Sequence, residues 1–128
     1  MKEKLPIIAG GLLGLLFVVF GLNFFLHFLP IPAPTEGSPM SMFMGAMYMT
    51  GYLTFVKVLE ITGGVLVAIP KTRNVGLIIL TPIVVNILAA HIFLMKGAGL
   101  LDPPVIMITL LSAFLIWSAR KSASALLG

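Results

Sequence analysis

Two charged side chains lie inside one of the most apolar stretches of this 128-residue chain. Lys57 and Glu60 occupy the first half of segment 51–70, GYLTFVKVLEITGGVLVAIP. Residues three apart share a helix face, so an ammonium and a carboxylate at this spacing can pair along one helix. A buried carboxyl group can take up or release a proton, and a neighbouring ammonium can tune it or hold an anion. We therefore predict Glu60 as a proton acceptor or donor and Lys57 as a ligand-binding residue.

A second polar group falls at a matching depth in the next apolar segment. Counting along a helix from Val75 places Asn86 about 16 Å in, and Glu60 lies about 15 Å below the outer end of its own segment. Antiparallel neighbours would bring these two side chains together. Pro82 removes a backbone donor four residues before Asn86 and is expected to bend the helix beside the polar layer. The alternative to a ligand site is a structural clamp, in which Lys57, Glu60 and Asn86 only hold the helices together.

Three further polar residues complete the predicted ligand-binding set. His91 follows Asn86 but lies about 140° around an ideal helix from it, so the two need not share a pocket unless the proline bend rotates them. Asn23 and His27 are one turn apart on one face of the first apolar segment. His27 and His91 could also hold haem, although no haem-binding motif accompanies them.

A methionine-rich segment, PMSMFMGAMYM, precedes the charged one. It contains Met40, Met42, Met44, Met47 and Met49. Thioethers are soft ligands that suit Cu(I), so copper binding at the outer face is an alternative function. Methionine is also ordinary flexible filler in a segment that lies on or enters a membrane. We favour filler and predict no metal site, and we expect neither copper nor haem as the cofactor.

The composition is that of an integral membrane protein. Hydrophobic residues make up 59% and charged residues 9% of the chain, against about 25% charged in soluble domains. The chain has no cysteine, which excludes disulfides and thiolate metal sites. Its net charge of +4 is divided among the short connections between apolar runs, so the basic residues act as topology signals and not as a nucleic-acid surface.

Four apolar segments approach the roughly 20 residues that a membrane crossing requires. They are residues 5–29, 50–69, 75–95 and 103–119. The first is too long for the apolar core of a signal peptide, which is about 7 to 15 residues, so we expect it to be retained. The sequence thus predicts a single all-α domain, an antiparallel four-helix bundle. Gly10 and Gly14 have the spacing that lets helices approach closely, and we expect them to serve packing within the bundle.

Basic residues near the segment ends predict the orientation. With four spans, six of them fall on one side of the membrane: Lys2, Lys4, Lys71, Arg73, Arg120 and Lys121. Only Lys96 falls on the other side. Since positively charged residues stay in the cytoplasm, both termini are predicted to be cytoplasmic, in a multi-pass protein of the inner membrane. The polar residues described above then gather in the outer half of the bundle.

Residues 50–94, TGYLTFVKVLEITGGVLVAIPKTRNVGLIILTPIVVNILAAHIFL, resemble the DoxX family of small four-span membrane proteins. VKVLEITGG and TPIVVNILAAH fit the family's pattern around its second and third spans. The resemblance implies six signature positions: Lys57, Glu60, Gly64, Pro82, Asn86 and His91.

The DoxX family takes its name from a subunit of a thiosulfate:quinone oxidoreductase, and other members are described as membrane partners of redox or detoxifying enzymes. The resemblance therefore implies a membrane subunit of an oxidoreductase system that binds a quinone or a small polar ligand. It also implies the lipid bilayer and other membrane or redox-enzyme subunits as partners. The lack of cysteines, which some redox-linked relatives use, counts against electron transfer by this chain itself. A non-enzymatic scaffold is the alternative.

Overall fold

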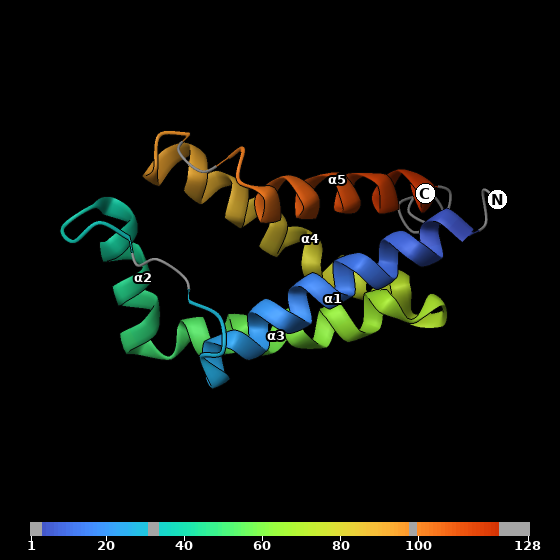
Figure 1. Cartoon of the computed structure of the whole chain (residues 1–128), viewed down its shortest axis with the longest axis horizontal. Coiled ribbons are helices and arrows are strands. Elements are labelled where there is room, and N and C mark those ends of the chain that lie inside the picture. Colours follow the sequence, from blue (N-terminus) through green and yellow to red (C-terminus); the bar gives the residue numbers. More distant parts are fainter. Residues whose placement is uncertain (1–3, 31–33, 98–99, 121–128) are drawn as a thin grey trace.

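The computed structural model describes residues 4–30, 34–97 and 100–120 (Figure 1). In these residues every regular element is helical and there is no strand, which confirms the all-α prediction. The elements in chain order are α1 (Lys4–Leu26), α2 (Pro39–Thr50), α3 (Tyr52–Ala68), the 3₁₀ turn η1 (Pro70–Thr72), α4 (Arg73–Ala89), the π-helical η2 (Ala90–Leu94) and α5 (Pro103–Ser118).

Two helical stretches are long and apolar enough to cross a membrane, Lys4–Leu26 and Pro70–Leu94. Helix α2 has 12 residues and α3 has 17, so they would supply a third crossing only together, although their axes differ by 87°. Helix α5 is apolar but has 16 residues, roughly 24 Å of helix against an apolar slab of about 30 Å. The chain therefore has the character of a membrane protein, with two to three candidate crossings by length and composition.

The structure contains one helix that the sequence analysis did not predict, the separate helix α2. Its first turn is capped at Ser38, whose hydroxyl oxygen accepts a hydrogen bond from the Ser41 N–H at 3.2 Å. It ends at Gly51, which has φ of 81°, a left-handed conformation that glycine adopts without steric cost. The chain turns at this glycine, so α2 leaves the line of α3 instead of extending it (Figure 1).

Glycines hold α3 against both of its neighbours. A Cβ atom on Gly14 of α1 would overlap the carbonyl oxygen of Gly64, and one on Gly64 would lie 2.9 Å from the carbonyl oxygen of Gly14. A Cβ atom on Gly76 of α4 would lie 2.9 Å from the carbonyl oxygen of Gly63. These backbones touch because neither side has a side chain. The expectation that Gly14 serves packing within the chain is confirmed.

The apolar core lies where α1, α3, α4 and α5 meet. Its fully buried side chains are Leu13, Phe17, Val67, Leu80 and Leu115. Helices α3 and α4 pack tightly at the hairpin that joins them and diverge toward their other ends, where α2 and η2 lie (Figure 1). The described part of the chain is thus closed at the hairpin end and open at the α2 end.

Candidate functional site

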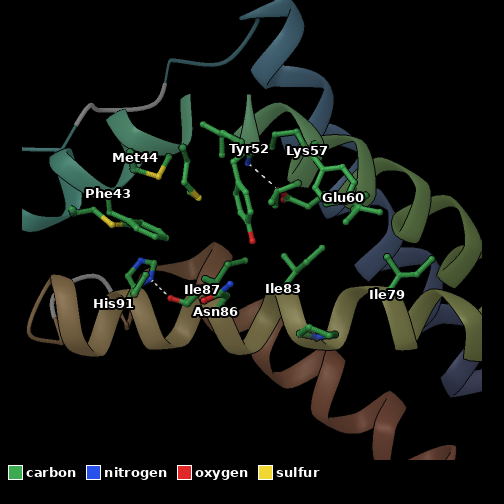
Figure 2. A pocket seen from close by; sticks show the side chains of 18 residues that line it. Phe43, Met44, Tyr52, Lys57, Glu60, Ile79, Ile83, Asn86, Ile87 and His91 are labelled. Atoms are coloured by element: carbon green, nitrogen blue, oxygen red, sulfur yellow. Dashed lines mark hydrogen bonds and ion pairs between the residues drawn. The ribbon is translucent and has the colours of Figure 1, made fainter. Parts of the chain in front are cut away.

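A cavity of about 480 Å³ lies at the open end, between α2, α3 and the continuous stretch α4–η2 (Figure 2). Most of its wall is aliphatic, aromatic or methionine. Four of the predicted site residues line it: Lys57, Glu60, Asn86 and His91. The structure therefore brings together the polar residues that the sequence placed in two different helices.

Helix α3 contributes an ion pair to this wall. The Lys57 ammonium lies 3.2 Å from a carboxylate oxygen of Glu60, with the i, i+3 spacing that the sequence predicted. The Glu60 side chain is buried, whereas that of Lys57 is 22% exposed. Burying a carboxyl group among apolar side chains is costly, and the Lys57 ammonium offsets part of that cost. Both residues belong to α3, so the pair by itself does not tie one helix to another.

The opposite wall is formed by α4 and η2. The Nδ1 atom of His91 lies 2.7 Å from the carbonyl oxygen of Ile87. A carbonyl oxygen only accepts hydrogen bonds, so Nδ1 carries the proton. In the neutral ring, Nε2 then keeps its lone pair for a ligand. His91 belongs to a π-helical turn, closed by a hydrogen bond from Met95 N–H to Ala90 O at 3.1 Å, a feature common at functional sites.

Asn86 and His91 share the cavity although an ideal helix separates them by a wide angle. Asn86 lies on the side of α4 that faces α3, and His91 lies beneath α2 (Figure 2). Both side chains lie on the side of α4–η2 that faces α2 and α3, so one cavity reaches both of them.

The predicted ligand-binding set does not include the third wall of the cavity, whose methionines belong only to the copper alternative, or the hydroxyl group of Tyr52. Met40, Phe43, Met44 and Met47 line the cavity from α2. The Tyr52 ring reaches from the start of α3 toward α4, with its hydroxyl group in the open space (Figure 2). The i, i+4, i+7 spacing of the three methionines is a helix-face pattern that could have predicted this wall. Nothing in the sequence indicated that this face would turn back onto α4.

The structure does not bring Asn23 and His27 to this cavity. Asn23 is buried at the end of α1, where its Nδ2 donates to Leu29 O at 3.2 Å and its Oδ1 accepts from Leu29 N at 2.6 Å. His27 is exposed in a left-handed conformation, with φ of 53°. These two residues close the first predicted span three residues before its expected end at Leu29. The proposed haem pair therefore lacks a shared cavity, because His91 lines it and His27 does not.

The methionines of α2 are also divided. Met40, Met44 and Met47 line the cavity, whereas Met42 and Met49 are 63% and 86% exposed. Among the described residues, no three of His, Cys, Asp and Glu gather where they could hold a metal ion. A cation site built from carboxylates and imidazoles is therefore not present in this part of the chain.

No protein-family model matches the sequence, and neither a curated protein nor a solved structure shows significant similarity to it. The resemblance to the DoxX family consequently rests on the two motifs quoted above.

Proposed function

We propose that this chain is a DoxX-like membrane protein, a subunit or partner of an oxidoreductase system, that binds a quinone or a similar small amphipathic ligand between α2, α3 and α4. The observation that carries this proposal is the convergence of Lys57, Glu60, Asn86 and His91 on one mainly apolar cavity. Ligand sites commonly combine apolar walls with a few polar groups that fix orientation. Ionisable residues inside a membrane segment are rare without a task.

The polar groups that can contact the ligand lie on two walls of the cavity. Lys57 and Tyr52 can donate hydrogen bonds from α3, and Asn86 can donate or accept from α4. The lone pair of His91 Nε2 can accept from a hydroxyl group of a reduced ligand. Glu60, held by Lys57 at 3.2 Å, takes or gives the proton that accompanies reduction or oxidation of the ligand. The electrons are exchanged with the partner subunit of the oxidoreductase system, which the proposal includes.

The arrangement also supports an antiparallel four-span bundle with cytoplasmic termini. The start of α1, the α3–α4 hairpin and the end of α5 lie at one end of the molecule (Figure 1). They carry Lys4, Lys71, Arg73 and Arg120, and the turn after η2, which carries Lys96, lies toward the other end. Lys2 and Lys121 lie outside the described residues. Under the positive-inside rule the basic end is cytoplasmic, in the inner membrane, and the cavity opens in the outer half.

Helix α5 is shorter than the apolar slab, and the residues at its C-terminal end can anchor it at the membrane surface. The Arg120 guanidinium lies 4.2 Å from the centroid of the Trp117 ring, and its Nη1 donates to Trp117 O at 2.8 Å. A tryptophan and a basic residue at a helix end anchor it at the headgroup level. The bilayer can thin slightly around the short helix.

The test uses a photoreactive quinone in detergent-solubilised full-length protein, with cross-links mapped by mass spectrometry. We expect labelling on α3 and α4, and a loss of about tenfold or more in affinity for Glu60→Gln, since a hydrogen bond to a charged group contributes about 1.5–3 kcal/mol. The control is Glu36→Gln, which makes the same change at an exposed loop position. A parallel titration with thiosulfate distinguishes a quinone from a small sulfur anion.

The non-enzymatic scaffold makes the opposite prediction. If Lys57 and Glu60 serve only stability, Glu60→Gln lowers the unfolding midpoint and no quinone labels the cavity in the wild-type protein. That result would replace the ligand site by a structural clamp.

A further inference from the structure

Helix α2 presents three of its methionines to the cavity and two away from it. Met40, Met44 and Met47 follow each other at i, i+4 and i+7, so they form one stripe along the helix. Met42 and Met49 are largely exposed. The bend at Gly51 turns the stripe toward η2, which α2 contacts. The three inward methionines therefore bring three soft thioether sulfurs to one wall of the cavity.

A nitrogen ligand faces this stripe. His91 lies on η2 at the α2 end of the cavity, below Phe43 and Met44 (Figure 2). Its Nδ1–H donates to Ile87 O at 2.7 Å. A backbone carbonyl on one ring nitrogen is the usual partner of a histidine whose other nitrogen binds a metal, because it fixes the ring and the tautomer. Nε2 is the nitrogen left for that ligand.

We propose that the α2 end of the cavity binds one soft monovalent cation, Cu(I), through the sulfurs of Met40, Met44 and Met47 and the Nε2 atom of His91. Thioether and imidazole ligands without a carboxylate or a thiolate select Cu(I) over harder divalent ions. The described residues offer no rival cluster of carboxylates and imidazoles. Methionine has three rotatable bonds, so each of these side chains can adjust its sulfur toward an ion.

The copper site does not depend on the quinone site. It uses the α2 end of the cavity and does not involve Lys57 or Glu60, which lie on α3. His91 is common to both, so the methionines are the residues that separate the two proposals.

The first experiment measures Cu(I) affinity of the full-length protein in detergent by competition with a chromophoric Cu(I) chelator. Replacing Met40, Met44 and Met47 together by leucine should weaken binding by roughly tenfold or more, because even the loss of an outer partner of a metal ligand costs about 10- to 100-fold. The double control Met42→Leu/Met49→Leu should bind like the wild type. Leucine and methionine have similar volumes, so both variants should fold.

Two more variants complete the titration. His91→Gln should also weaken Cu(I) binding, and Glu60→Gln should leave it unchanged. Zn²⁺ serves as the harder competitor and should not displace Cu(I).

The second experiment measures how well a bound cation protects each methionine from oxidation. Ag(I), a redox-inert soft cation of the same charge, is added before mild oxidation with hydrogen peroxide, and methionine sulfoxide is located by mass spectrometry. Ag(I) should protect Met40, Met44 and Met47 and leave Met42 and Met49 unprotected.

Equal protection of all five methionines, or equal Cu(I) affinity of the triple variant and the wild type, would overturn the proposal. Equal affinity for Zn²⁺ would overturn it as well. If Glu60→Gln abolishes quinone labelling but Cu(I) binding is absent, only the copper site fails.

Discussion

The glycine contact between α1 and α3 predicts opposite effects for the same substitution at two glycines of α1. Gly11 and Gly14 both lie inside α1. A Cβ atom on Gly11 would have nothing within 4 Å. A Cβ atom on Gly14 would overlap the carbonyl oxygen of Gly64 and lie 2.8 Å from the Cβ of Ala68. The first methyl group points into open space and the second into a backbone.

The expected changes in the free energy of unfolding follow from these surroundings. Gly11→Ala should stabilise the fold by roughly 0.5–1 kcal/mol, the cost of a glycine inside a helix. Gly14→Ala gains the same stabilisation from helix propensity. Its new methyl group, however, meets the backbone of Gly64, which cannot rotate away as a side chain could. Helices α1 and α3 must therefore separate, and overpacking of this kind costs about 1–3 kcal/mol. We expect a net loss of stability for Gly14→Ala.

The assay is reversible unfolding in mixed micelles with increasing SDS, followed by the fluorescence of Trp117, the single tryptophan of the chain. Circular dichroism checks that both variants remain helical. A rise in the midpoint for both variants would refute the assignment of Gly14 to an internal α1–α3 contact. A Gly14→Ala variant with wild-type stability but a changed molecular mass would instead place this glycine at a contact between two copies.

Three further predictions concern the polar residues and the bend. Asn23→Ala should lower stability by about 1–3 kcal/mol, because it removes both hydrogen bonds with Leu29; SDS unfolding measures this, and unchanged quinone labelling would confirm that Asn23 is structural. Lys57→Met should destabilise by about 3 kcal/mol by leaving Glu60 buried without its cation. The double variant with Glu60→Gln should recover much of that loss, and a double variant as unstable as the single one would contradict the ion pair. Gly51→Ala should lower the free energy of unfolding by about 1–2 kcal/mol, because φ of 81° disfavours any residue with a Cβ atom. The distribution of distances between spin labels on α2 and α4 should broaden in this variant. An unchanged distribution would show that this glycine does not set the bend.

The sequence predicted the helices well because their cause is local. Apolar runs of membrane length, separated by proline and glycine, indicated the positions of α1, α3, α4–η2 and α5 to within a few residues. The Lys57–Glu60 pair was also predictable, since both residues belong to one helix and helical geometry alone brings them to 3.2 Å.

The candidate site was predictable only in part, because its third wall depends on a bend. The methionine segment was treated as filler near the membrane, and nothing in its spacing reveals the 87° angle between α2 and α3. Asn23 and His27 were assigned to the site because they share a helix face. The turn after α1 instead uses the Asn23 amide for its own backbone.

By itself, the amino-acid sequence determined that this is an all-helical chain of membrane composition and that it carries a buried acid beside a base. These properties follow from hydropathy and from the periodicity of a single helix, which need no partner element. Only the tertiary structure decided that Asn86, His91 and the inward methionines meet that pair across one cavity. That meeting depends on the bend between α2 and α3 and on the packing of three separate elements, neither of which hydropathy or the periodicity of one helix contains.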